Sequence, residues 1–408
     1  MLNVRPSRRP GLLVAGMALL FTGPVLAADL VNTPLADLTA PEPALPPPES
    51  HLSLQAVGTE TGIWDQNPLM LIKGATPLYG SITAPELIFN DRTPTSQFLV
   101  DTTVDENLFN LSTFDSTDFH QNINLTDQNE RWGVGVQEKT DYDTTRTSEL
   151  TPIGIDTIPI RHLGVSLSPE VSFSPTATDK LSLLTNGVMS QYDSPIYSNY
   201  AIVSATPTYT HIFDPLNAGT LSVQAQQYQT ISGPKVTVDT IGPSVGWIAT
   251  LTPRWTAKAT VGLQEADQSG SGTIPEPWSL QYIFSADIGF KGEQDTTDFI
   301  ASRADYPFGN GTESLLTTFT MTEAHNLNPL ISLNLTGSYQ TATYQSSAVG
   351  SIDTLISASP GLAYHVTDQL DFVASYQYRI ESFIATPGNA QDNTVTFGIV
   401  YHPQSWAL

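Results

Sequence analysis

The side chains that could carry chemistry do not form a recognisable catalytic or metal-binding motif. The chain has seven histidines and no cysteine, which excludes thiolate metal sites, cysteine nucleophiles and disulfides. No two histidines have the spacing of a zinc site, and no Gly-x-Ser-x-Gly turn presents a nucleophilic serine. We therefore expect no catalytic residue, no metal site and no cofactor. The histidines are His51, His120, His162, His211, His325, His365 and His402.

More informative are the polar side chains that alternate with apolar ones. In Leu370–Glu381 every second residue is apolar, and polar residues occupy most of the positions between. A β-strand sends successive side chains to opposite faces, so this segment has one apolar and one polar face. Hydroxyl and amide groups on such a face can hydrogen-bond a hydrophilic solute weakly enough to release it. The candidate pore-lining residues are Glu170, Lys258, Asp287, Asn334, Asp371, Ser375, Gln377 and Arg379.

Strands with this alternation recur along the chain, for example in His162–Ser174 and Thr394–His402. Their length, about ten to twelve residues, suits a tilted strand that crosses a bilayer. Tyrosines near one end of the apolar face fit an aromatic girdle at the lipid boundary. Four prolines fall inside such strands, and we expect a β-bulge at each because proline cannot donate to the ladder. They are Pro169, Pro207, Pro243 and Pro360.

The connectors between these strands alternate in length. Short ones such as Val366–Gln369 alternate with longer loops such as Glu265–Trp278, which is the asymmetry of an outer-membrane barrel. Counting back from the last strand gives about 16 strands, with the first near residues 96–110, and 14 or 18 also fit because boundaries are uncertain. The predicted fold is all-β, a transmembrane antiparallel up-and-down β-barrel.

The composition is acidic and low in charge. Charged residues make up 14% of the chain, and 40 acidic against 16 basic residues give a net charge of −24. Such a surface argues against binding nucleic acid or anionic phospholipid. In a pore it would favour cations over anions.

The N-terminal residues 1–27 are typical of a secretory signal peptide, with arginines before the apolar run Leu12–Phe21 and a small residue, Ala27, at the cleavage position. Residues 28–50 are rich in proline and are expected to form an extended linker. For residues 51–95 we expect a periplasmic lead-in or a segment at the barrel mouth, because their alternation is unclear and prolines interrupt it. Residues 96–408 are expected to form the barrel.

The chain resembles the β-barrel porins of Gram-negative outer membranes, and within them the group associated with exopolysaccharide export. Asp105-Glu106-Asn107-Leu108-Phe109 with a downstream Asp118 is similar to an early signature of that group. Tyr209–Asp214 and Ser359–Tyr364 resemble its strand-to-turn phrases. The resemblance implies an outer-membrane location, contact with lipid, passage of a hydrophilic solute or polysaccharide, and compatibility with a homo-oligomer.

The C-terminus resembles in part the signal read by the barrel-assembly machinery, the remaining partner that we expect. Thr396-x-Gly398-x-x-Tyr401 has the spacing of that signal, but Pro403 replaces an apolar residue and the chain continues to Leu408. Two other functions stay open. An outer-membrane barrel enzyme needs a serine, histidine and acid constellation at the rim, and a secreted soluble β-sandwich that binds carbohydrate needs its apolar faces to meet in one core.

Overall fold

The structure is a computed structural model. The expected signal peptide (1–27) and linker (28–50) lie outside the residues that it describes. No helix in the described part of the chain is long and apolar enough to cross a membrane. The described residues are 51–148, 159–270, 276–307, 313–344, 352–383 and 388–407.

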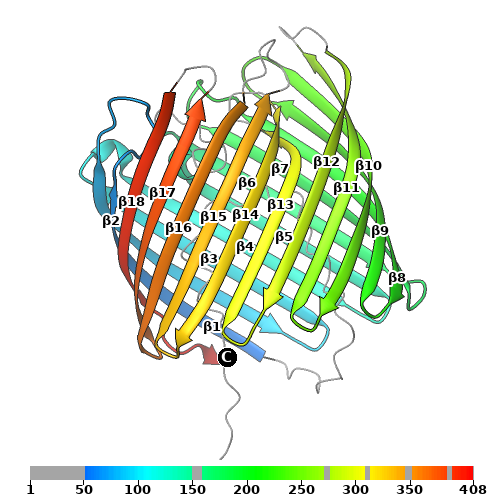
Figure 1. Ribbon diagram of the computed structural model, residues 1–408, viewed down its shortest axis with the longest axis horizontal. Coiled ribbons are helices and arrows are strands. Elements are labelled where there is room, and N and C mark those ends of the chain that lie inside the picture. Colours follow the sequence, from blue (N-terminus) through cyan, green and yellow to red (C-terminus); the bar gives the residue numbers. More distant parts are fainter. Residues whose placement is uncertain are drawn as a thin grey trace, which may run out of the picture.

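The chain forms a closed antiparallel barrel in which each strand from β1 to β18 pairs with the next (Figure 1). The barrel closes where β18 pairs with β1, with Tyr401 opposite Gly58 and Thr394 opposite Asp65. The strands are β1 (His51–Asp65), β2 (Leu78–Arg92), β3 (Ser96–Phe109), β4 (Ser116–Gln128), β5 (Trp132–Thr144), β6 (Arg161–Phe173), β7 (Asp179–Tyr192), β8 (Tyr200–Asp214), β9 (Asn217–Thr230), β10 (Val236–Thr252), β11 (Trp255–Gly270), β12 (Glu276–Lys291), β13 (Asp295–Pro307), β14 (Glu313–Asn328), β15 (Ile331–Tyr344), β16 (Ile352–Thr367), β17 (Leu370–Phe383), β18 (Gly388–Tyr401) and the short β19 (Trp406–Ala407).

The barrel has 18 strands where the sequence predicts about 16. The two additional strands are β1 and β2, which lie in residues 51–95, where a lead-in segment was expected. β2 pairs with β1 along its full length and also pairs with β3, so both strands belong to the wall. Their apolar residues fall on both faces, as in Ile88 and Phe89, which hides the alternation in the sequence.

Short and long connectors lie at opposite rims. We call one rim the long-loop rim, and its connectors include 66–77 and 110–115. Connector 110–115 contains a 3-10 turn (Ser112–Phe114). The connector after β5, at the same rim, begins with the short helix α2 (Thr145–Ser148). Both the start of β1 and the end of β18 lie at the other rim, the short-turn rim. The short-turn rim has the connectors 93–95, 129–131, 174–178, 215–216, 253–254, 292–294, 329–330 and 368–369.

The four strand prolines do not cause bulges. They lie in β6, β8, β10 and β16, which all run toward the short-turn rim. Beside each proline the pairing with one neighbouring strand is interrupted, but it resumes in the same register, as from Ala358–Tyr378 to Gly361–Ser375. The expected bulges are therefore wrong, because proline removes a ladder hydrogen bond without inserting an extra residue.

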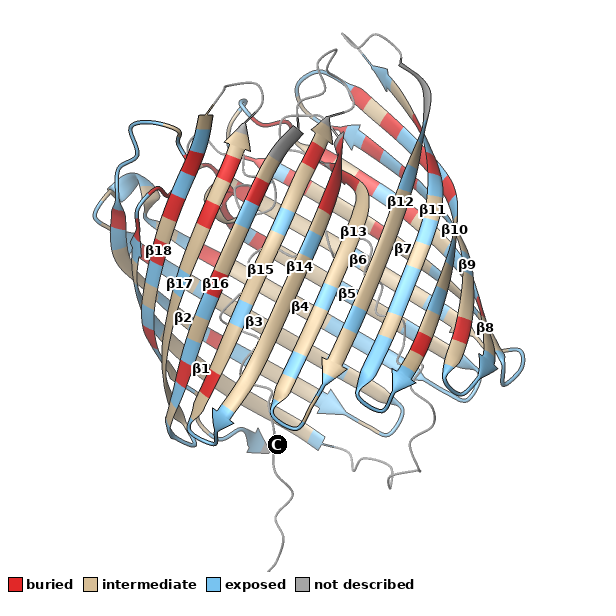
Figure 2. Ribbon diagram, viewed as in Figure 1, coloured by how far each residue is buried: buried red, intermediate tan, exposed pale blue. Residues whose placement is uncertain are grey.

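Large apolar side chains are exposed on one face of the wall, and polar side chains are buried on the other. Figure 2 shows how exposed and buried positions are distributed along the strands. Leu280 is 70% exposed and Phe397 is 58% exposed, whereas Arg379 and Asp392 are buried. In a closed barrel only the inner face is shielded, so the apolar face points outward. A soluble β-sandwich would bury its apolar faces in a shared core, and the structure excludes this alternative.

Candidate functional site

The candidate site is the inner wall of the barrel, where strand alternation gathers the polar side chains. On β17 the predicted Asp371, Ser375, Gln377 and Arg379 share one face, and Phe372 lies on the opposite one. Within that face Ser375 Oγ lies 2.5 Å from Thr396 Oγ1 of β18. Arg379 is buried, which shows that this end of the row is enclosed rather than open to water.

The other predicted residues come from four further strands. Lys258 of β11 lies opposite Asp287 of β12, so their opposite charges are cross-strand neighbours. Asn334 of β15 lies opposite Gly361 of β16, where an added Cβ would come within 2.1 Å of the Asn334 Oδ1 atom. Glu170 of β6 lies opposite a glycine of β5. The predicted role of all these residues as a pore lining stays a prediction.

Arg379 is the centre of a buried charged cluster that ties the closing strands together. Its Nη2 and Nε atoms donate hydrogen bonds to Oδ2 of Asp392 over 2.8 and 3.1 Å, and Nη2 lies 3.8 Å from Oδ2 of Asp65. Asp392 also accepts hydrogen bonds from the backbone N–H of Asn67 and from the Thr394 hydroxyl. Because Asp65 is on β1 and Asp392 on β18, the cluster spans the closure of the barrel.

At the short-turn end of the same strands, Asp371 joins two histidines. Its Oδ1 accepts from Nδ1 of His365 at 2.8 Å, and its Oδ2 accepts from Nε2 of His402 at 3.0 Å. His365 Nε2 in turn lies 3.1 Å from the Ser332 hydroxyl. The sequence identified Asp371 but not its partners, because the histidines are brought to it by strand pairing.

The residues that carry the family resemblance also meet on the inner wall. Asn107 Nδ2 donates to Oδ2 of Asp118 over 2.9 Å, and both side chains are buried. Arg161 Nη1 donates to Oδ1 of the same carboxylate over 2.6 Å. The signature asparagine and its downstream aspartate therefore form one hydrogen-bonded unit between β3 and β4.

A second cluster of charged side chains lies on β3, β4 and β5, nearer the short-turn rim than Asn107 and Asp118. His120 Nδ1 lies 2.7 Å from Asp141 Oδ1, and His120 Nε2 lies 3.6 Å from Asp105 Oδ2. Lys139 Nζ lies 3.2 Å from the other oxygen of Asp141. Glu86 and Asp101 add further carboxyl groups to this region, and no basic side chain among the described residues forms an ion pair with either. Acidic groups therefore outnumber basic ones on this part of the wall.

The structure brings together a serine, a histidine and an aspartate that sequence reasoning missed. His162 Nδ1 lies 3.1 Å from Asp143 Oδ1, and His162 Nε2 lies 2.7 Å from Ser190 Oγ. Gly164 gives the imidazole room, since a Cβ there would come within 3.0 Å of the ring. This connectivity is that of a nucleophilic triad. However, all three side chains are buried, and Ser190 is paired with strands on both sides, so its amide serves the ladder rather than an oxyanion.

Next to this hydrogen-bonded chain is an apolar cluster inside the barrel, near the long-loop rim. The Tyr192 ring lies 4.9 Å from the His162 ring, and a cavity of about 80 Å³ touches His162, Ser190, Tyr200 and Ile202. The network therefore lines one side of a small cavity. The cluster consists of Ile160, Tyr192, Tyr197, Tyr200, Ile202, Tyr228, Val236 and Val238.

Taken together, the inner wall offers hydroxyls, amides and an excess of carboxyl groups to whatever enters the barrel. No three histidine, aspartate or glutamate side chains in the described ranges are grouped as a metal ion would need. Such a lining can hydrogen-bond a hydrated solute and attract cations.

The sequence matches no protein-family model and no curated protein sequence, so the expected exopolysaccharide-export group finds no support in these comparisons. Three solved structures show a related arrangement at low identity. OccK1 (OpdK) of Pseudomonas aeruginosa is 9% identical with a TM-score of 0.48, covering 87% of this chain and 99% of that one. OccAB2 of Acinetobacter baumannii is 10% identical with a TM-score of 0.46, covering 88% and 98%. The ferric citrate transporter FecA in its unliganded form is 10% identical with a TM-score of 0.47, covering 86% of this chain and only 64% of FecA. At these values the likeness carries no information on solute or mechanism.

Proposed function

We propose that this protein is an outer-membrane channel that passes hydrophilic solutes and favours cations. The observation that carries the proposal is a closed barrel whose outer face is apolar and whose inner face is polar and acidic. A closed sheet has no edge strand with a row of unpaired backbone groups, which hydrocarbon would not tolerate.

The outer face supports the membrane setting. Val203 is 65% exposed and Leu221 is 53% exposed, although large apolar side chains in water would be unfavourable. Near the short-turn rim, Trp132 and Phe173 lie with ring centroids 4.4 Å apart, and Tyr142 lies outward toward the other end of β5. Aromatic residues at both ends of an apolar band are typical of barrels that span the outer membrane.

The inner face supports the preference for cations. Asp65, Asp118 and Asp141 each meet a basic partner, whereas Glu86 and Asp101 have no basic partner among the described residues. A carboxylate without a basic partner in a water-filled lumen raises the local concentration of cations.

We further propose that the solute is a polysaccharide. The support is the sequence resemblance together with rows of hydroxyl and amide groups such as Ser338, Ser357 and Gln340, which can hydrogen-bond sugar hydroxyls. A role as an enzyme is not part of the proposal, because the buried Ser190 lacks the access that a nucleophile needs.

Liposome swelling tests the passage of solute. Liposomes with the refolded protein are diluted into isosmotic neutral sugars, from a pentose to oligosaccharides of increasing length, with heat-denatured protein as the control. We expect swelling with small sugars and a decline with size, and continued swelling with long oligosaccharides would favour polysaccharide passage. Absence of swelling even with a pentose, from protein shown to be folded by heat-modifiable migration, would contradict the proposal.

A further inference from the structure

The barrel wall is interrupted between β12 and β13 near the long-loop rim. Their pairing ends where Phe284 lies opposite Arg303, although both strands continue beyond this pair. β12 stays paired with β11 there, and β13 stays paired with β14. The two strands therefore separate while each keeps its other neighbour. We call the interval between residues 280–283 of β12 and residues 304–307 of β13 the wall gap.

The end of β13 passes inside the barrel, and Figure 1 shows it turning away from β12. The buried amide of Gln264, on β11, donates a hydrogen bond to the carboxylate of Asp305, so β13 reaches across the inner side of β12. Tyr306 borders the cavity of about 80 Å³ that His162 and Tyr200 of the opposite wall also touch. Asp305 and Tyr306 are both buried, although successive residues of a strand point to opposite faces. This end of β13 is therefore covered on both faces.

The beginning of β14 is displaced in the same way. Residues 314–317 are four consecutive buried residues, whereas Phe319, a little further along the strand, is 47% exposed. A strand that lies in the wall of a barrel turns every second side chain toward lipid. The ends of β13 and β14 that meet at the long-loop rim are therefore folded inward together, which opens the wall gap beside β12.

The wall gap lies at the depth of the lipid. Phe290 and Trp255, with ring centroids 4.8 Å apart, lie near the short-turn rim, where the apolar band begins. Phe284 is six residues from Phe290 along β12. A strand tilted by about 40° rises roughly 2.6 Å per residue, so the gap begins roughly 16 Å above Phe290 in a band about 25 Å tall. Tyr282 and Leu280 beside the gap are 58% and 70% exposed. The gap therefore faces the hydrocarbon of the leaflet at the long-loop rim.

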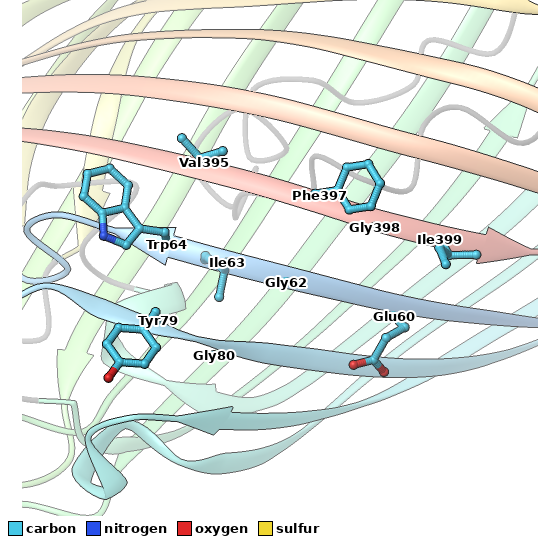
Figure 3. A pocket seen from close by; sticks show the side chains of 10 residues that line it. All are labelled: Glu60, Gly62, Ile63, Trp64, Tyr79, Gly80, Val395, Phe397, Gly398 and Ile399. Carbon is cyan, nitrogen blue, oxygen red and sulfur yellow. The ribbon is translucent and has the colours of Figure 1, made fainter.

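Other irregularities of the wall do not open it. A groove of about 580 Å³ lies on the outer surface over β18, β1 and β2, with Trp64 and Phe397 along it (Figure 3). Beneath this groove the ladder is continuous, because Ile63 of β1 lies opposite Gly80 of β2 on one side and Thr396 of β18 on the other. Beside the strand prolines the pairing resumes in the same register. Between β12 and β13 it does not resume among the described residues.

Behind the wall gap the interior is apolar and aromatic. Tyr306 shares its cavity with Tyr200 and Ile202, which belong to the apolar cluster of the inner wall. In the same cluster the rings of Tyr192 and Tyr197 are stacked with centroids 5.0 Å apart. Aromatic side chains around a cavity favour apolar ligands, and flat aromatic molecules above all, because these can stack on the rings.

We propose that the wall gap is a lateral passage through which a small aromatic molecule moves from the apolar cluster into the hydrocarbon of the membrane. The passage joins two apolar surroundings, so such a molecule does not have to cross the acidic part of the lumen. Arg303 marks its lower edge. The guanidinium carbon lies 4.5 Å from the centroid of the Tyr282 ring, and Nη1 donates to the Thr317 hydroxyl over 2.7 Å. These contacts fix the point at which β13 leaves β12.

Cysteine cross-linking tests whether the two strands separate. The chain contains no cysteine, so each introduced pair reports on its own position. Ala286→Cys/Ala301→Cys places two cysteines opposite each other below the gap, at a separation that suits a disulfide. Tyr282→Cys/Asp305→Cys would be such a pair if the ladder continued. We expect the second pair to cross-link at least tenfold less than the first on mild oxidation of folded protein, and equal yields would overturn the proposal.

Uptake of N-phenylnaphthylamine, an aromatic probe that fluoresces when it enters hydrocarbon, tests the passage. Apolar molecules cross a plain phospholipid bilayer unaided, so the assay uses intact Gram-negative cells, whose lipopolysaccharide leaflet excludes the probe. We expect at least fivefold faster uptake with the wild type than with Ala304→Trp, which fills the gap. The matched control Ala286→Trp enlarges the outward face of β12 below the gap and should behave as the wild type.

Leu280→Asp serves as a second variant in case Ala304→Trp impairs folding. It places a charge at the mouth of the gap, near the lipid boundary where the barrel tolerates it, and should also slow uptake of the probe. Uptake by wild-type cells no faster than by cells without the protein would overturn the proposal, as would undiminished uptake with both gap variants when heat-modifiable migration shows them folded. Liposome swelling with a pentose is measured on the same variants, so failure of the lateral passage is distinguished from failure of the hydrophilic channel.

Discussion

Replacing Arg379 with methionine removes the only guanidinium group that contacts Asp392 among the described residues. The Arg379 side chain is 9% exposed and the Asp392 side chain is fully buried, so solvent screens their interaction little. Breaking a buried ion pair by removal of one partner costs about 3–5 kcal/mol. Asp392 keeps its hydrogen bonds from the Asn67 N–H and the Thr394 hydroxyl, which places the expected loss near the lower end, about 3 kcal/mol.

Urea unfolding of the barrel in phospholipid vesicles, followed by tryptophan fluorescence, measures this loss. A change of about 3 kcal/mol shifts the unfolding equilibrium by roughly 150-fold. Asp392→Asn should partly relieve the effect, so the double variant Arg379→Met/Asp392→Asn is expected to be less destabilised than the sum of the single variants. Lys258→Met, an exposed position on the inner wall, is the control and should change stability by less than about 0.5 kcal/mol.

Two results would refute this reasoning. One is Arg379→Met with a free energy of unfolding within about 0.5 kcal/mol of the wild type, which is the range of a neutral surface change. The other is strict additivity in the double variant, since residues that form one hydrogen-bonded pair are expected to couple.

Three further predictions concern assembly and packing. Phe372→Arg puts a charge on the lipid face and should reduce the heat-modifiable fraction on gels, whereas Ser375→Arg on the inner face should reduce it less; equal damage would reverse our assignment of the faces. Gly398→Val should impair closure by about 1–3 kcal/mol in urea unfolding, because a Cβ there meets Glu60 O at 2.9 Å, whereas Gly58→Val meets nothing within 4 Å and should be tolerated. Ile202→Ala should cost about 2–5 kcal/mol in the same assay, because this side chain is 1% exposed, and a smaller loss would mean that the apolar cluster is loosely packed.

The sequence predicts the strand pattern best where lipid covers one face. In Leu370–Glu381 the outward positions are all apolar, and the predicted strand begins at the residue where β17 begins. Asp371 and Arg379 lie on the opposite face of the same strand. Hydrocarbon tolerates few polar side chains, so the outward face of such a strand can be predicted from the sequence alone.

The first two strands were missed because both of their faces carry apolar side chains. In β1, Ile63 and Trp64 are neighbours on opposite faces, and in β2, Pro85 interrupts the ladder pattern. Glu60 weakens the signal further, because it occupies an outward position where the alternation calls for an apolar residue. Local patterns therefore undercounted the strands, although the barrel itself was predicted.

The partners within the inner wall could not be predicted, because they depend on closure of the barrel. Asp65 and Arg379 lie near opposite ends of the chain and meet only where β18 pairs with β1. Similarly, Asp143, His162 and Ser190 come from three strands, and nothing in their spacing signals the contact. The sequence therefore identifies single candidate residues, but not the hydrogen bonds and ion pairs that they form with one another.

The zero-current potential of the protein in a planar bilayer tests the central claim most directly. With a tenfold gradient of potassium chloride across the bilayer, a pore lined by excess carboxyl groups should give a potential of the sign set by potassium. A potential of chloride sign, or no conductance at all from folded protein in several lipids, would contradict the account of an acidic, water-filled channel.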